Sequence, residues 1–310
     1  MKKSIFLLVS LVFLFSCSKT DENTPLPRET AQLQLQFQFQ ENQVRLDNAG
    51  KVSTIPNGNA AQTPEFRAMS IHLIELVPSA ATAVGSGVII YQGEEINLGG
   101  DTAINFDEAL VSDEGRIFKT LPLQDIPAGQ YEFIRVSVAY QNYDIQFNLN
   151  NVPFVGDLMN QKGSIASFLG FNTYLGTVSV NTMALAINAA HRQGFWVFET
   201  ELETPFENYN TIQSGTAPAG ATTVVNPLAG ISDIPEGSCL VTGKFTTPLV
   251  ISAQAKNDLA LTLSFSINRS FEWVDTNNNG ALDFDVMTPS NNEPIVDMGV
   301  RGLIPTWQEK

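Results

Sequence analysis

The chain has 310 residues, of which 43% are hydrophobic, and its formal net charge is −15 with only 17 lysines and arginines. Such an acidic chain is repelled by the phosphates of nucleic acid and by anionic lipid headgroups, which argues against both as partners. The two cysteines, Cys17 and Cys239, do not suggest a disulfide framework, and Cys239 is expected to be a small buried hydrophobe.

The N-terminus has the pattern of a secretory signal. Two lysines precede an apolar run at 5–15, which is too short for a transmembrane helix, and Ser16 comes directly before Cys17. The order Leu-Phe-Ser-Cys at 14–17 resembles a bacterial lipobox, in which cleavage precedes a cysteine that carries lipid. This resemblance implies loss of residues 1–16, lipidation of Cys17 and a mature net charge of −15 − 2 = −17. The alternative is an ordinary cleaved signal with an incidental cysteine.

Residues 17–30 are expected to be a disordered leash, because they are polar, contain two prolines and show no apolar periodicity. Serine, lysine and then acidic residues follow the cysteine, an order that resembles the export signal of surface lipoproteins in Bacteroidetes. The resemblance implies a lipid anchor in the outer membrane and exposure at the cell surface. A periplasmic orientation is the alternative.

From residue 31 onward the chain is predicted to form strands. Leucine and phenylalanine alternate strictly with glutamine over 32–40, which indicates a strand with one buried face. The best helix candidate is 182–191, and the polar stretch 210–223 is expected to be a surface loop. Similar patterns predict further strands at 69–77, 88–91, 131–140, 144–149 and 258–273.

These elements predict an all-β fold, an antiparallel β-sandwich built as one large or two adjacent sandwiches. Asparagine, proline and glycine interrupt the strand pattern at 150–162, which suggests a domain at 31–150 and a second β-rich domain at 151–310. The uncharged segment 163–190 is too polar and too rich in glycine to span a membrane.

The order of features resembles the prealbumin-like or transthyretin-like β-sandwich lipoproteins of Bacteroidetes. The residues that carry this likeness are the alternating first strand, Ile-Glu-Leu at 74–76, and the stretch 121–131 that leads into Ile-Arg-Val. The likeness covers residues 31–150 and implies a sandwich fold there.

A weaker likeness adds Gln-Gly-Phe-Trp-Val-Phe-Glu at 193–199 and is to periplasmic copper-binding β-sandwich proteins. It implies copper and a redox partner. Copper needs His, Met or Cys ligands, and neither His72 nor His191 has a second ligand at suitable spacing. His72 is expected to be a structural histidine within a strand.

The loop 275–286 resembles the calcium loops of extracellular modules. Its oxygen-bearing side chains fall at positions 1, 3, 5 and 9, with Gly280 at position 6. Val286 stands at position 12, where an EF-hand has glutamate, and Asp285 is the substitute. Calcium would make this loop rigid; the alternative is a polar hairpin with local Asx turns. The candidate calcium ligands are Asp275, Asn277, Asn279, Ala281 through its carbonyl, Asp283 and Asp285.

No catalytic motif is present, and the protein is predicted not to be an enzyme. Glu199, Glu201 and Glu203 alternate along one strand and are expected to be a solvated edge. The predicted function is binding or scaffolding at the cell envelope, by adhesion or by capture of a glycan or an outer-membrane protein. Trp196, Trp273 and Tyr143 could form a sugar platform or pack in the core. The alternatives are a copper-binding periplasmic protein and a glycan-active enzyme.

Overall fold

The computed structural model describes residues 30–47, 50–218, 220–221 and 240–310. Over these residues the protein is all-β, as the sequence predicts, and its sheets pack together in the manner of a β-sandwich. Cys17, Cys239 and the leash before residue 30 lie outside the described residues. No helix within the described part has the length and apolar character needed to cross a membrane. The helical elements there are the 3-10 turns η1 (Phe106–Glu108), η2 (Leu123–Asp125) and η3 (Pro289–Asn291).

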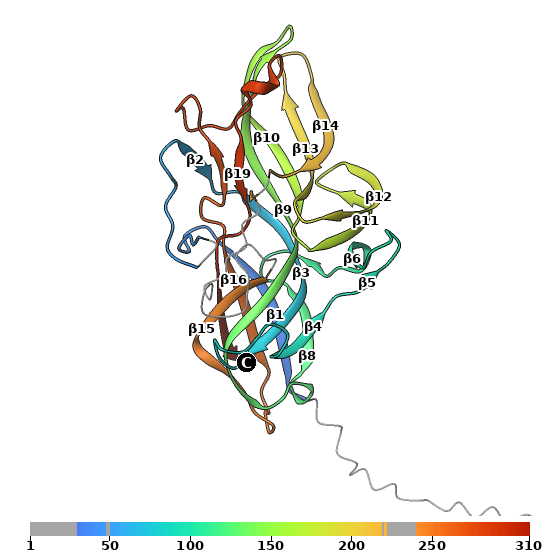
Figure 1. Ribbon diagram of the computed structural model, residues 1–310, viewed down its shortest axis with the longest axis vertical. Coiled ribbons are helices and arrows are strands. Elements are labelled where there is room, and N and C mark those ends of the chain that lie inside the picture. The colour runs from blue at the N-terminus through green and yellow to red at the C-terminus, as the bar shows by residue number, and fades with distance from the viewer. Residues whose placement is uncertain (1–29, 48–49, 219, 222–239) are drawn as a thin grey trace, which may run out of the picture. The chain divides into compact units, whose positions relative to one another are not determined.

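Residues Ala31–Lys310 form a single compact unit. The strand β9 (Gly129–Val152) extends through it over 24 residues (Figure 1). The first half of β9 pairs with β15 (Leu240–Ile251) and the second half with β10 (Gly156–Phe168). The interruption at 150–162 is therefore the turn and first part of the β9–β10 hairpin, and pairing continues through it. Of the two arrangements that the sequence left open, the structure has the single unit.

The largest sheet has nine strands and contains β9 near its centre. Its order is β14-β13-β10-β9-β3-β4, and β15 and β18 also pair with β9 while β7 pairs with β3. The remaining strands of this sheet are β3 (Glu65–Val77), β4 (Val88–Gln92), β7 (Val111–Ser112), β13 (Phe195–Glu203), β14 (Asn208–Thr216) and β18 (Asp283–Asp285).

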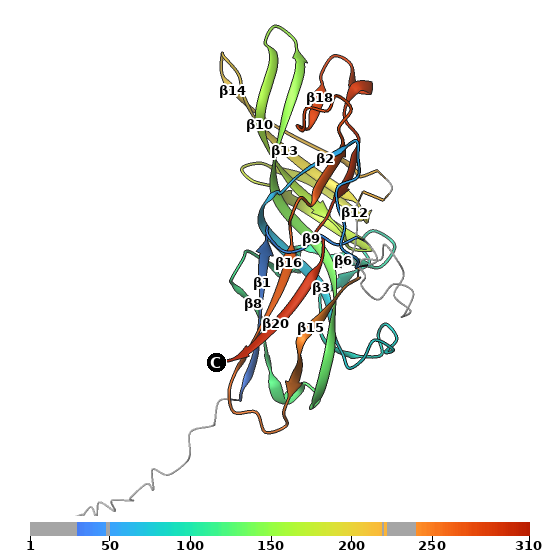
Figure 2. The same ribbon diagram turned by 90° about the vertical axis from the view of Figure 1, so that its left-hand side faces the viewer.

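A four-stranded sheet covers one half of the large sheet and completes a sandwich (Figure 2). Its order is β20-β16-β1-β8, and its β1–β16 pair is parallel although the chain is mostly antiparallel. The alternation over 32–40 is confirmed, since Leu33, Leu35 and Phe37 are fully buried while the intervening glutamines are not. The strands are β1 (Gln32–Gln40), β8 (Ile117–Pro122), β16 (Leu259–Ser266) and β20 (Leu303–Glu309).

Two small sheets cover opposite faces of the other half. Alternate residues of β10 and β13 point to different cores: Ile165 and Phe198 pack with Trp273, whereas Ala166 and Val197 pack with Leu175. The first small sheet contains β2 (Asn59–Gln62), β17 (Phe271–Val274) and β19 (Ile295–Met298). The second contains β5 (Glu95–Ile96), β6 (Ala103–Asn105), β11 (Asn172–Ser179) and β12 (Ala184–Arg192).

Three local predictions were wrong. The helix expected at 182–191 is β12, because pairing with β11 overrides the intrinsic helix preference of its alanines. The run 258–273 is two strands, and Arg269 turns the chain between them with φ of +47°. The surface loop expected at 210–223 contains most of β14.

Candidate functional site

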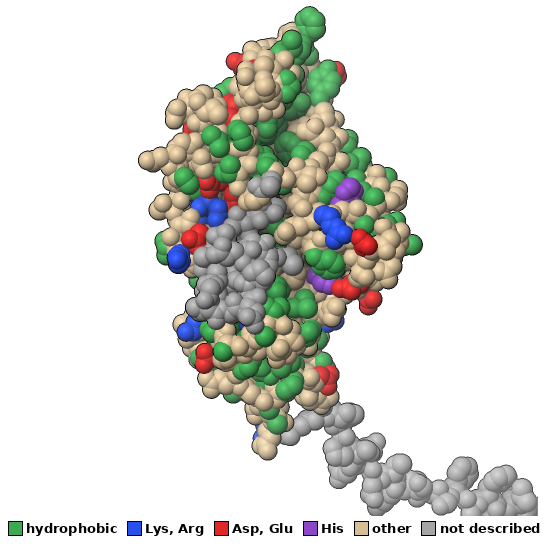
Figure 3. Space-filling model, in the orientation of Figure 1, with side chains coloured by type: hydrophobic (Ala, Val, Ile, Leu, Met, Phe, Trp, Pro, Cys, Tyr) green, Lys and Arg blue, Asp and Glu red, His purple; other side chains and the backbone are tan. Residues whose placement is uncertain are grey.

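A cavity of about 590 Å³ lies between the large sheet and the C-terminal segment 284–298. Figure 3 shows hydrophobic side chains lining a hollow in the upper part of the face that is turned toward the viewer. The sheet contributes Phe147 from β9, Trp196 and Phe198 from β13, and Gln213 from β14. Phe284 comes from β18 of the same sheet, and the opposite wall contains Pro294, Ile295 and Met298. The lining is therefore mostly apolar, with polar side chains toward β14.

The aromatic side chains of the sheet wall lie over glycines. A Cβ on Gly163 would come within 2.2 Å of the Phe198 ring, and one on Gly215 within 2.4 Å of the Trp196 indole. Since atoms this close overlap, these two positions accept only hydrogen in this arrangement. Glycine on β10 and β14 thus allows two large rings to lie flat on the sheet and form the cavity wall.

Hydrogen bonds from β9 hold the opposite wall in place. Tyr143 donates its hydroxyl to the carbonyl of Met298 at 2.9 Å, and the Gln141 side-chain amide donates to the same oxygen. Tyr143 is 1% exposed and Trp273 is 2% exposed, so both are core residues. Of the three aromatics considered for a sugar platform, Trp196 lines the cavity.

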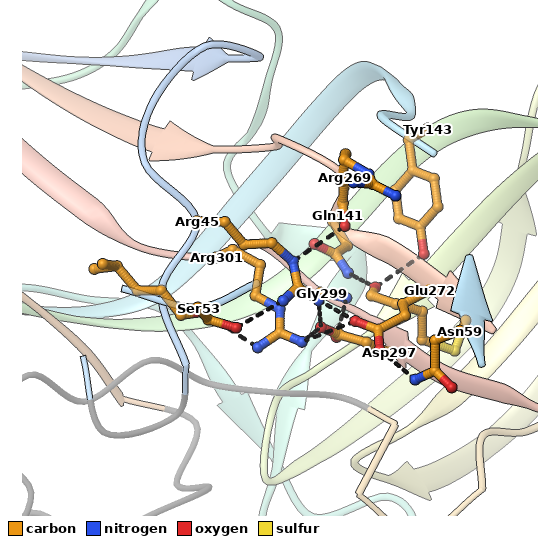
Figure 4. Close-up of polar contacts among 12 residues, drawn as sticks. Arg45, Ser53, Asn59, Gln141, Tyr143, Arg269, Glu272, Asp297, Gly299 and Arg301 are labelled. Carbon is orange, nitrogen blue, oxygen red and sulfur yellow. Dashed lines mark hydrogen bonds and ion pairs between the residues drawn. The ribbon is translucent and has the colours of Figure 1, made fainter. Parts of the chain in front are cut away.

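Four buried charges lie next to this wall (Figure 4). Arg45 is paired with Glu272 and Arg301 with Asp297, and the crossed pairs Arg45–Asp297 and Arg301–Glu272 are each 3.7 Å apart. Burial raises the pKa of Asp297 to about 7 in spite of the two arginines. Each carboxylate faces guanidinium groups, and neither is among the described residues that line the cavity, so the cluster joins chain segments beside the cavity wall.

The loop at 275–283 is closed by its own side chains. Both carboxylate oxygens of Asp275 accept backbone N–H groups, from Asn279 at 3.1 Å and Gly280 at 2.9 Å. Gly280 has φ of +77°, and the Trp273 indole donates to the carbonyl of Ala281 at 3.0 Å. These are the Asx-turn contacts of a polar hairpin. They also leave lone pairs on Asp275, because a carboxylate has about four acceptor sites.

Asp283 is surrounded by amides. One of its oxygens accepts from Asn148 at 2.9 Å and Asn150 at 3.2 Å, and the other accepts from Asn277 and Asn279, each at 2.7 Å. Burial alone would raise the pKa of Asp283, but these hydrogen bonds together lower it below its ordinary value. A cation at this position would replace the amide groups of Asn277 and Asn279.

Asp285 does not join the other candidate ligands. It accepts the backbone N–H groups of Met287 and Thr288 at 3.0 and 2.8 Å and so forms a turn of its own. Glu293 is found beside the loop instead, 3% exposed, accepting from the N–H of Thr276 at 2.8 Å and of Asp283 at 2.9 Å. The loop motif does not reveal Glu293, because this residue lies beyond the loop at no fixed spacing from it.

Neither histidine has a metal-site environment. His72 is buried with its Nε2 2.9 Å from Glu95, consistent with a structural histidine, and His191 stacks on the ring of Phe195 at 3.8 Å. Within the described ranges no group of three or more His, Cys, Asp or Glu side chains is placed to hold a metal ion.

Glu199 is not the solvated residue that the sequence suggested. It is 1% exposed and accepts the backbone N–H groups of Asn181, Thr182 and Met183 at 2.9 to 3.1 Å. Burial would raise the pKa of Glu199, but the Thr182 hydroxyl and these N–H groups lower it. Its carboxylate therefore holds the turn before β12.

Comparisons of the chain with protein-family models, with curated protein sequences and with solved structures give no match.

Proposed function

We infer that this protein is a non-catalytic binding protein of the bacterial cell envelope that takes its ligand into the apolar cavity. The observation that carries this inference is the cavity itself. Its volume of about 590 Å³ lies within the range of roughly 300 to 1,000 Å³ that is typical of ligand pockets. An apolar hollow with a few polar groups along one side is the usual form of such a site.

The lining selects against anionic ligands. Among the described residues that line the cavity there is no Lys or Arg side chain, so an anionic headgroup would find no partner there. The carboxylates of Asp285 and Glu293, which also line it, would repel such a headgroup. The geometry therefore favours an uncharged ring or apolar side chain that stacks on Trp196, as supplied by a sugar face or a protein segment.

The calcium prediction fits this function as structural support. The loop leads directly into β18, where Phe284 lines the cavity, and Glu293 connects the backbone of both segments. Calcium held by Asp275, Asn277, Asn279, Ala281 and Asp283 would make one cavity wall rigid. Glu293, rather than Asp285, would then take the place of the glutamate at position 12 of an EF-hand.

The lipid on Cys17 would attach the protein to the outer membrane through the leash at 17–30. The acidic surface gives the folded unit no electrostatic attraction to anionic lipid. Expression of Cys17→Ser should therefore move the protein from the membrane fraction to the soluble fraction. Mass spectrometry of the wild-type N-terminal peptide should show the acyl chains.

The cavity is tested with Nile red, a neutral fluorophore that brightens in apolar surroundings, titrated into the lipid-free unit 31–310. Saturable binding at one site is expected. Gln213→Trp places an indole in the cavity, and it should abolish the signal. Ser214→Trp is the matched control, because Ser214 is the next exposed residue of β14 and does not line the cavity. Equal binding by both variants would contradict the proposal.

A further inference from the structure

The outer strand of the large sheet is an open edge. β14 pairs with β13 through all nine of its residues without a register shift, and with no other strand of the described chain. Seven of its nine residues are exposed. Figures 1 and 2 show β14 at the outer margin of the sheet.

The pairing fixes which backbone groups of β14 are available. Ala217 donates its N–H to the carbonyl of Gly194 at 2.8 Å, and the register of Phe195 with Thr216 places those two residues directly opposite each other. Bonded and non-bonded positions alternate along an antiparallel pair. The residues that turn their N–H and C=O away from β13 are therefore Asn208, Asn210, Ile212, Ser214 and Thr216.

Edge strands of β-sheets normally carry features that prevent pairing with another chain, such as charged residues, proline or bulges. The sequence of β14, NYNTIQSGT, contains no charged residue and no proline. The other long edges do have such features. Pro305 lies in β20, Lys119 lies in β8, and β12 has a register shift with Asn188 at φ of +53°.

We propose that β14 is a docking edge at which an extended, basic and apolar segment of a partner protein adds as a further strand. Strand addition of this kind uses main-chain hydrogen bonds for affinity and pockets for alternate side chains. Thr211, Gln213 and Thr216 of β14 line the apolar cavity. Alternate side chains of an added strand would therefore point along the same face toward the cavity mouth.

The charge of the hairpin defines the partner. Residues 195–216 include no Lys or Arg, whereas Glu201, Glu203 and Glu207 lie along or beside the strands. Phe206 in the turn is 77% exposed and Tyr209 is 47% exposed, which provides two aromatic contacts next to the acids. A second copy of this chain would bring the same acids against each other, so a basic partner is favoured over self-association.

This inference rests on the proposed binding function and names the class of partner. It is tested with a fluorescent peptide of alternating valine and lysine, nine residues long to match β14, and with a valine–glutamate peptide as control. The lipid-free unit 31–310 should bind the lysine peptide, as measured by fluorescence anisotropy, and not the glutamate peptide. Methylation of alternate backbone nitrogens of the lysine peptide should abolish binding.

Ser214→Pro removes an outward N–H and should weaken peptide binding by about tenfold or more, since proline is tolerated on an edge but cannot pair. Should this variant fold poorly, Asn210→Lys with Ser214→Lys provides a second block by charge. Gln213→Trp should lose Nile red but still bind the peptide backbone. Nile red binding therefore tests the cavity proposal and peptide binding tests the edge proposal, so either can fail independently of the other.

Undiminished binding by Ser214→Pro or by the methylated peptide would overturn the proposal and reduce the interaction to charge attraction. Absence of peptide binding by the wild-type unit would overturn it also. A dimer in sedimentation experiments that disappears in Ser214→Pro would show that a second copy, and not a basic partner, occupies the edge.

Discussion

Glu75 of β3 and Arg135 of β9 stand directly opposite each other, both 0% exposed, with carboxylate and guanidinium 3.2 Å apart. Glu75 also accepts the N–H of Gly87, and Arg135 donates to the carbonyls of Thr82 and Ala83. The pair thus fastens the β3–β4 loop to the sheet. These are the acidic and basic residues of the Ile-Glu-Leu and Ile-Arg-Val segments.

Breaking this pair should destabilise the fold strongly. Glu75→Gln leaves the buried Arg135 charge without its counter-ion, and removal of one partner of a buried pair costs about 3 to 5 kcal/mol. Urea denaturation should show this loss in the free energy of unfolding. Asp125→Asn, at an exposed carboxylate, is the control and should change stability by less than about 0.5 kcal/mol. Similar values for the two variants would mean that the pair contributes little.

Asp297 should make the folded protein less stable as the pH rises, which is opposite to the usual effect of a paired carboxylate. Its pKa is raised to about 7 in the folded protein, so the folded state holds this proton more tightly than the unfolded state. The stabilising contribution of the protonated form is present below about pH 4 and is lost as the pH rises toward 7. Other carboxylates titrate over part of this range, and a comparison with Asp297→Asn separates them.

Wild type should therefore lose more unfolding free energy than Asp297→Asn between pH 5 and pH 7.5, as measured by urea denaturation. Parallel curves for the two proteins would show that Arg45 and Arg301 keep Asp297 ionised throughout this range.

Calcium should raise the melting temperature of the unit 31–310 above its value in EDTA. At a tenfold excess over the dissociation constant, a ligand specific to the folded state adds about 1.4 kcal/mol. Asp275→Ala should abolish the rise, because it removes the carboxylate at the first position. Asp285→Ala should keep the rise, since that carboxylate forms a separate turn. Identical melting in calcium and EDTA would leave the loop as a polar hairpin.

Gly163→Ala should destabilise the protein although alanine usually suits a strand better than glycine. Its Cβ would lie 2.2 Å from the Phe198 ring, and overpacking of this kind costs about 1 to 3 kcal/mol. Phe198→Leu in the same chain should recover part of the loss in a double-mutant cycle. The control is Gly129→Ala in β9, where the nearest side-chain atom would be 3.9 Å away. Equal effects at the two glycines would contradict the close packing of the cavity wall.

The strand character of the protein follows from its amino-acid pattern alone. The pleat of a strand sends successive side chains to opposite faces, so the alternation of Leu33, Leu35 and Phe37 with glutamine was sufficient to predict a half-buried strand. Local pattern was also sufficient to place Gly280 in a tight polar turn. It could not separate strand from helix at 184–192, where the choice was made by pairing with β11.

The way in which these elements form a site depends on long-range pairing and packing. The parallel pairing of β1 with β16 joins residues 226 positions apart, and packing of apolar faces rather than local propensity selects such partners. Glu293 reaches the loop through the turn after β18, and the cavity exists because β13 and the segment 284–298 enclose it. The open edge of β14 likewise follows from its place in the strand order, which no single segment encodes.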